Sequence, residues 1–247
     1  LSSEGGLAAA EAIMTTDSVP KLASEPHEQG WTVGGMAKGA GMLAPGLATM
    51  LVVLTTDAEV DAAALDAALR RATRVTFDRI DSDGCMSTND TVLLLASGAS
   101  GVVPDPDAFA QAVTGVCSDL ARQLIADAEG ATKDIRIDVV GAATEDEAVT
   151  AARAVSRSNL LKCAIHGEDP NWGRIISAVG TTDVTFEPDA IDVAINGVTI
   201  CRDGAGFGDR SQVDMSAREV AISIDQLLSV PVSPLAPDGP VGPMLPW

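Results

Sequence analysis

A short glycine-rich segment places a threonine directly before an apolar run, where a hydroxyl could act as a nucleophile. The segment GGMAKGAGMLAPG carries one positive charge, Lys38, and leads through a Pro45-Gly46 turn to Ala48 and Thr49. Because Ala48 has a small side chain, its carbonyl is unshielded. Thr49 Oγ1 could attack that carbonyl, take over the acyl group from nitrogen, and let water release a new chain that begins at Thr49.

The α-amine freed by such a cleavage would supply the base that a threonine otherwise lacks. Its ordinary pKa is about 8, which is close to neutrality, so it can accept the proton of its own hydroxyl. The alternative is that Thr49 is a structural residue beside a strand, with its hydroxyl satisfied locally. The residues around Thr49 leave both interpretations open.

Composition excludes several classes of partner. The 247 residues are enough for one large domain or two modest ones, and the core must be aliphatic because only 3% of residues are aromatic. The formal charge of -19 argues against nucleic acid and anionic membranes. The sequence contains no run of 18 apolar residues, so we expect no membrane span. The four cysteines are widely spaced, which predicts neither a zinc site nor a redox pair and fits a reducing compartment.

The first half of the chain alternates predicted helices and strands. We expect a helix ending at residues 8–14 and a strand at 31–37. The apolar run at 50–54 fits a strand buried on both faces or a buried helical turn, and 91–96 fits another buried strand. Thr56 and Glu59 match a capping box, which predicts a helix beginning there. Asp105 and Pro106 predict the start of a long helix that Gly130 closes.

The second half repeats this pattern. Residues 135–139 alternate as in a half-buried strand, a second capping box spans Thr144 to Glu147, and 160–165 reads as a strand. Asn196-Gly197 predicts a hairpin turn, and Asp169-Pro170 predicts a capped helix. Cys117 and Cys163 are expected among apolar neighbours. We predict domains at 1–131 and 132–229, and an irregular tail at 230–247, where prolines recur at every third position.

Two further clusters carry no chemistry. Residues 78–84, DRIDSDG, lack the ligand spacing of a calcium loop, so no metal site is expected there. No nucleophile motif accompanies His166, which argues against a role as general base.

Five segments together resemble the ornithine acetyltransferase, or glutamate N-acetyltransferase, family of arginine biosynthesis. In chain order they are AIMTTDSVPK, KGAGMLAPGLATMLVVLTTDA, STNDTVLLLASG, DAEGATK and GEDPNWGRI. One such motif would be weak, but five in the family's order are specific. The resemblance covers the chain from Leu1 to about Asp225.

The resemblance implies a role for four side chains. Thr49 would be the nucleophile, freed by cleavage of the Ala48–Thr49 bond, and would carry the acetyl group from N-acetylornithine to glutamate as an ester. Thr15 and Lys38 would bind substrate. Glu129 would bind the substrate's amino group, as a carboxylate facing an ammonium can do.

The resemblance also implies a fold and an assembly. The fold would be mixed α/β, a self-processing sandwich with layers α, β, β and α and a smaller C-terminal α/β unit. We expect a cytoplasmic heterotetramer of two α and two β chains after self-cleavage. No cofactor and no metal is expected, and acetyl-CoA is a further donor in some members.

Two parts of the family pattern are absent from this sequence. They are the region before Leu1, with an oxyanion-hole Thr-Gly pair, and the C-terminal segment with an Asn and a Ser or Thr. We therefore expect a chain lacking the family's N-terminal region and with a divergent C-terminal tail. Two alternatives remain: a self-processing threonine amidase or aminopeptidase that gives the acyl group to water, and an inactive truncated remnant.

Overall fold

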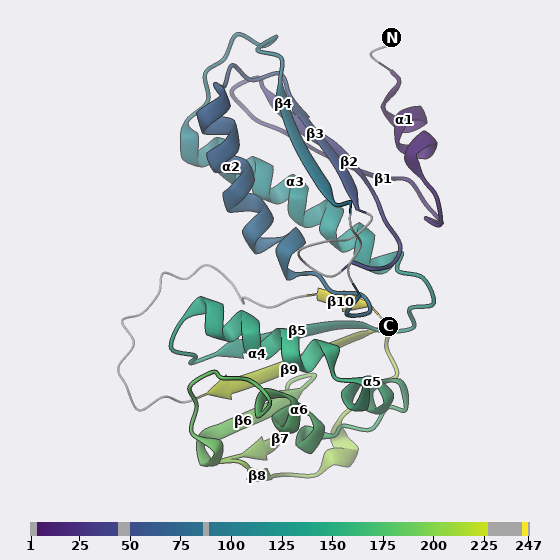
Figure 1. Cartoon of the computed structure of the whole chain (residues 1–247), viewed down its shortest axis with the longest axis vertical. Helices are drawn as coiled ribbons and strands as arrows, with labels where there is room; N and C mark the ends of the chain where they lie inside the picture. The colour runs from purple at the N-terminus through teal and green to yellow at the C-terminus, as the bar shows by residue number, and fades with distance from the viewer. Residues whose placement is uncertain (1–3, 44–49, 86–88, 227–243, 247) are drawn as a thin grey trace. The chain divides into compact units, whose positions relative to one another are not determined.

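The computed structural model describes residues 4–43, 50–85, 89–226 and 244–246. The chain forms two compact units, residues 1–129 and 130–247, and each contains one sheet and its own helices (Figure 1). The mixed α/β class predicted from the sequence is confirmed. In the part of the chain that the structure describes, no helix is both long and apolar enough to cross a membrane.

The sheet of the first unit has the order β1-β2-β3-β4. Its strands are β1 (Lys21–Pro26), β2 (Thr32–Lys38), β3 (Leu51–Thr56) and β4 (Thr91–Ala96). β1, β2 and β3 are antiparallel neighbours, whereas β4 runs parallel to β3. The strand predicted at 31–37 is therefore present as β2, and the ends of β2 and β3 meet where Lys38 lies opposite Leu51.

Two helices cover one face of this sheet. α2 (Ala62–Val75) packs against α3 (Pro106–Ala126), and α3 lies across β1 and β2. The approach is close: a Cβ added at Gly35 would lie 2.5 Å from Leu54 Cδ2 and 3.3 Å from Leu120 Cδ1. On the other side of the sheet lies the short helix α1 (Gly6–Ile13), which contains the predicted Ala-rich helical residues (Figure 1). A single 3-10 turn, η1 (Phe77–Arg79), follows α2.

The face of the sheet that α2 and α3 leave uncovered is partly open. Burial alternates along β3, with Val52 and Leu54 buried and Leu51 exposed. On β4, an edge strand, Leu93 and Leu95 are 47% and 55% exposed. The strands predicted at 50–54 and 91–96 are present as β3 and β4, but neither is fully buried. The burial prediction was wrong because α2 and α3 cover one face of the sheet, whereas α1 packs on the other face mainly against β1 and β2.

The second unit is a six-stranded sheet with the order β10-β5-β9-β6-β7-β8. Its strands are β5 (Asp134–Val140), β6 (Ile191–Ile195), β7 (Val198–Arg202), β8 (Ala205–Gly206), β9 (Glu219–Gln226) and β10 (Met244–Pro246). The helices are α4 (Glu145–Arg157), α5 (Asn159–His166) and α6 (Trp172–Val179), with 3-10 turns η2 (Pro188–Ala190) and η3 (Arg210–Gln212). Aliphatic side chains from β5, β6, β9 and these helices form one core.

Several local predictions for the helices and turns are confirmed. Asp105 caps α3 and Pro106 begins it, while Thr144 Oγ1 accepts a hydrogen bond from Glu147 N at the start of α4. Asn196 and Gly197 turn the β6–β7 hairpin with φ angles of 50° and 80°. Each of these signals acts through neighbouring residues.

Other local predictions were wrong. Thr56 ends β3 and its hydroxyl donates to Thr32 O, so the helix begins later, with Asp61 as its cap. Residues 160–165 lie in helix α5, which Ser158 caps, and Cys163 is exposed there. α6 is capped by Asn171 instead of Asp169. α3 ends at Ala126, before Gly130.

The proline-rich segment lies largely outside the described residues. Within it, Met244–Pro246 pair with β5 as the short strand β10.

Candidate active site

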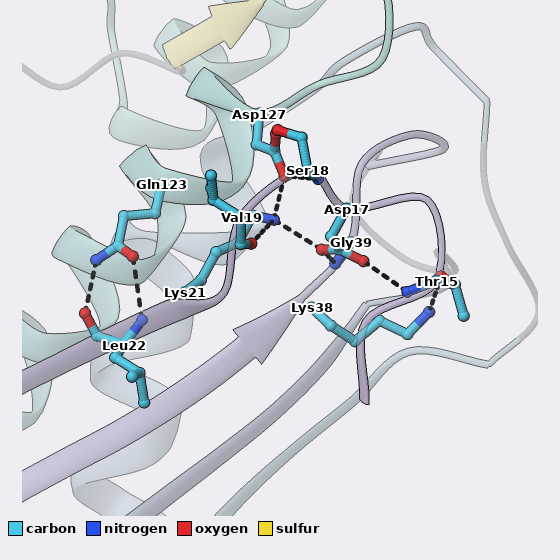
Figure 2. A network of polar contacts seen from close by, with 10 residues as sticks. All are labelled: Thr15, Asp17, Ser18, Val19, Lys21, Leu22, Lys38, Gly39, Gln123 and Asp127. Atoms are coloured by element: carbon cyan, nitrogen blue, oxygen red, sulfur yellow. Dashed lines mark hydrogen bonds and ion pairs between the residues drawn. The ribbon is translucent and has the colours of Figure 1, made fainter. Parts of the chain in front are cut away.

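The site begins at the C-terminal end of β2, where Lys38 contacts Thr15. Lys38 Nζ donates a hydrogen bond of 2.9 Å to Thr15 Oγ1, and the lysine is only 5% exposed. Side chains alternate along a strand, so Lys38 shares a face with Met36 and points away from the face that α3 covers. Thr15 reaches it from the loop between α1 and β1 (Figure 2). Two residues predicted to bind substrate are therefore in direct contact.

Thr49 and Ala48, the predicted nucleophile and cleavage site, lie outside the described residues. The residues on either side of that segment are anchored. Leu43 N donates to Ser82 Oγ, and Ser82 N donates to Leu43 O. Met50 N donates to Asp90 Oδ1 at 2.7 Å, and Thr91 N donates to Met50 O. Asp90 belongs to the STNDTVLLLASG motif, so this motif holds the residue that follows Thr49.

Glu129, the predicted carboxylate of the site, follows α3. Its backbone N–H donates to Ala40 O at 2.6 Å, which fixes it beside the loop that continues from Lys38. Its side chain is exposed. Because α3 ends at Ala126 with Asp127 as its cap, Glu129 lies beyond the last helical turn. The structure therefore brings Thr15, Lys38 and the backbone of Glu129 to the same end of β2.

A buried ion network lies directly behind these residues (Figure 2). Lys21 is fully buried, and its Nζ donates to Asp17 Oδ1 at 2.7 Å and to Asp127 Oδ2 at 2.6 Å. Asp17 also accepts hydrogen bonds from Gly39 N at 2.6 Å and Thr15 N at 3.2 Å. Burial alone would raise the pKa of Asp17, but the hydrogen bonds from Gly39 and Lys21 outweigh it and lower that pKa.

Asp127 has a similar environment. It accepts hydrogen bonds from Ser18 N and Ser18 Oγ. Burial would raise the pKa of Asp127, but the hydrogen bonds from Lys21 and Ser18 prevail and lower it. A carboxylate at a helix C-terminus is disfavoured by the helix dipole, so the ammonium of Lys21 is needed to stabilise it.

The arrangement suits the binding of a polar, charged molecule. A buried ammonium, a hydroxyl and an exposed carboxylate offer donors and an acceptor at one strand end. Among the described residues, no group of His, Cys, Asp and Glu side chains could hold a metal ion. Burial raises the pKa of the Cys117 thiol to about 12, so this cysteine is a core residue and not a rival nucleophile.

Sequence reasoning missed Asp17, Lys21 and Asp127. The family motifs contain all three, since Asp17 and Lys21 lie in AIMTTDSVPK and Asp127 opens DAEGATK. Lys21 directly follows a proline and lies four residues after Asp17, a spacing that could have indicated a buried ion pair. The second carboxylate that pairs with Lys21, that of Asp127, lies 106 residues away in the chain and gives no local signal.

The family model described as "ArgJ family" matches residues 1–229. This chain belongs to the ArgJ family. It is 68% identical over 225 residues to the arginine biosynthesis bifunctional protein ArgJ of Streptomyces coelicolor, a match covering 91% of this chain and 58% of that protein. The ArgJ protein of Mycobacterium leprae is 57% identical over 221 residues, covering 90% and 54%. The chain thus spans little more than half the length of these ArgJ relatives.

A solved ArgJ structure shows the same fold. The crystal structure of the arginine biosynthesis bifunctional protein argJ from Bacillus halodurans matches with a TM-score of 0.67 and 37% identity. The match covers 72% of this chain and 87% of that chain. The fold is therefore that of ArgJ, the N-terminal-nucleophile-like sandwich type, as the motifs predicted.

Proposed function

We propose that this chain carries the acetyl-transfer site of an ArgJ enzyme, which moves an acetyl group from N-acetylornithine to glutamate through Thr49. The observation that carries the proposal is the convergence of Thr15, Lys38 and Glu129 on one end of β2. Lys38 lies opposite Leu51 in the sheet, and Leu51 is two residues from Thr49. Two residues span at most about 7 Å, so the proposed nucleophile is covalently tied to a residue that lies opposite Lys38.

The chemistry would be a double displacement. Thr49 Oγ1 attacks the acetyl carbonyl of N-acetylornithine, and the C–N bond breaks as ornithine leaves with the hydroxyl's proton on its amine. The α-amine of Thr49 moves that proton. Glutamate's amine then attacks the acetyl ester, the ester C–O bond breaks, and the proton returns to Thr49 Oγ1. The contacts to Lys38, Thr15 and Glu129 would fix the charged ends of the substrate and so orient the acetyl group.

A free α-amine at Thr49 requires cleavage after Ala48, and the lengths of the relatives support it. The match to the solved ArgJ chain covers 72% of this chain, against 91% for the Streptomyces coelicolor protein, so it is the shorter match. It nevertheless covers 87% of the solved chain, against 58% of the Streptomyces coelicolor protein. The solved chain is therefore much shorter than a whole ArgJ protein, as a cleavage product would be.

The two products would remain associated. β2 precedes the proposed cut and β3 follows it, and the two strands are hydrogen-bonded from Val33–Thr56 to Lys38–Leu51. One sheet would then contain strands from both chains. We propose that two such pairs form the four-chain assembly, with native mass spectrometry as its test.

Intact mass of the purified chain tests the cleavage. We expect two species, residues 1–48 and 49–247, that co-purify, with Thr49 as the new N-terminus. Thr49→Ala should stay whole, because it removes the attacking hydroxyl. Thr49→Ser keeps a hydroxyl and should be cut. A wild-type chain that remains whole would contradict self-processing.

The fate of the acetyl group tests the transfer. With acetyl-labelled N-acetylornithine and excess glutamate, the label should appear in N-acetylglutamate and, transiently, on Thr49. Label appearing as free acetate would identify a hydrolase. No release of label from a cleaved chain would show an inactive remnant.

A further inference from the structure

One buried ammonium serves two carboxylates that belong to distant parts of the chain. Lys21 lies at the first position of β1, Asp17 precedes it in the loop that carries Thr15, and Asp127 caps α3. The side chains of Lys21 and Asp17 have no solvent exposure, and that of Asp127 is 8% exposed. A charge so placed is costly unless it is paired, so the three side chains stabilise one another as a unit.

Asp17 connects this unit to two substrate-binding segments. One of its oxygens accepts the N–H of Gly39, the residue after Lys38, and the other accepts the N–H of Thr15 itself. The hydrogen bond from Lys38 Nζ to Thr15 Oγ1 closes the loop between the two segments (Figure 2). Rotating Asp17 would therefore remove the acceptor of two backbone amides, that of Thr15 and that of the residue after Lys38.

Asp127 connects the unit to the third segment. It holds the end of α3 against Ser18 and Lys21, two residues before Glu129. One helical turn earlier, the side chain of Gln123 makes two hydrogen bonds to the backbone of Leu22. Its Nε2 donates to Leu22 O, and its Oε1 accepts from Leu22 N. α3 is thus fastened to β1 at two successive turns, and Glu129 leaves it from a fixed point.

We propose that Lys21 is the positioning residue of the site: its ammonium, held between Asp17 and Asp127, keeps Thr15, Lys38 and Glu129 in one arrangement. Lys21 is buried behind these residues and acts through them without touching substrate. The assignment of the three to substrate binding rests on the proposed function, whereas the mechanical role of Lys21 does not.

Amide hydrogen exchange of the full chain separates this role from general stability. In Lys21→Met we expect the amides of Thr15, Gly39 and Glu129 to exchange at least about tenfold faster, while the amides paired between β2 and β3 keep their wild-type protection. The Glu129 amide is informative because it donates to Ala40 O and not to Asp17 or Asp127, the two carboxylates that Lys21 pairs with. Wild-type protection at all three amides would overturn the proposal.

Two milder variants keep the proposal testable should Lys21→Met fail to fold. Asp17→Asn should speed exchange at Thr15 and Gly39 but leave Glu129 protected. Asp127→Asn should do the reverse. Identical patterns in the two variants would show general loosening, which contradicts a positioning role.

Lys133→Met is the matched control. Lys133 is also a buried lysine, and its Nζ donates to Met215 O, Ala217 O and Glu168 Oε1 in the other unit. This variant should leave Thr15 and Gly39 at wild-type exchange, and loss of protection there would contradict the specificity of Lys21.

Titration with N-acetylornithine tests the link to the site. Lys21→Met should weaken binding at least about tenfold, and Lys133→Met should not. If wild type fails to bind this probe, the proposed function is wrong, and the exchange data still decide the role of Lys21.

Discussion

At the scale of single residues, the paired carboxylates of the network make a testable contribution to stability. The pKa values of Asp17 and Asp127 are lowered in the folded chain. A lowered folded pKa means that the stabilisation is fully present above the unfolded value, near 4, and is lost as pH falls through the folded pKa. The contribution of the two carboxylates should therefore weaken in acid.

Asp127→Asn should cost about 3 kcal/mol at pH 7, since it leaves the buried ammonium of Lys21 with one carboxylate. The cost should shrink as the pH falls below about 4. Urea unfolding of both chains at pH 7 and pH 3 measures it. The control is Asp119→Asn on the same helix, whose pair with Arg122 is about half exposed at 3.6 Å and should matter little at either pH. Equal costs for Asp127→Asn at both pH values would contradict this account.

At the scale of secondary-structure elements, two aspartates face each other across strands β6 and β9. Asp192 lies directly opposite Asp225 in the antiparallel register. Burial, and then the charge of Asp192, raises the pKa of Asp225. A raised folded pKa means that the penalty is absent below the unfolded value near 4 and grows as pH rises through the folded pKa.

Asp225→Asn should accordingly stabilise the second unit at pH 7 by about 0.5 kcal/mol, since like charges directly opposite destabilise a sheet. Asp192→Asn should give a similar gain, and its amide oxygen can still accept the N–H of Asp203. The double variant should gain less than the sum, because either change alone removes the repulsion. Denaturant unfolding of the four chains tests this, and additive gains would show that the two charges do not interact.

Three of the correct predictions came from local signals, although the local signal at Thr56 failed because its hydroxyl bonds to Thr32 O instead. Asp105-Pro106, Thr144 and Asn196-Gly197 each satisfy backbone groups within a few residues, and each was predicted correctly. The apolar run at 160–165 was mistaken for a strand because short apolar runs fit both periodicities. The cap Ser158 selects the helix. At the site, the family motifs indicated Thr15 and Lys38, but the salt bridge from Lys21 to Asp127 depends on how α3 packs on β1.

At the scale of the whole molecule, each unit has its own core, but the sheet of the first unit is unevenly covered. On the face packed against α2 and α3, Val52 and Leu54 are almost completely buried. On the opposite face, Leu93 and Leu95 stay about half exposed, and Leu51 at the start of β3 is also exposed. Burial free energy scales with the apolar area removed from water, so the same residue type should contribute very differently on the two faces.

Leu54→Ala should therefore destabilise the chain by about 2–5 kcal/mol, the range for a buried leucine that leaves a cavity. Replacing Leu93 and Leu95 together by threonine, which also favours strands, should cost less than about 1 kcal/mol. Urea unfolding compares the two, and binding of a dye that reports exposed apolar surface should fall only in the Leu93/Leu95 variant. A cost for that variant as large as that of Leu54→Ala would mean that this face is covered in solution, and sedimentation of wild type would then show whether a second copy of the chain covers it.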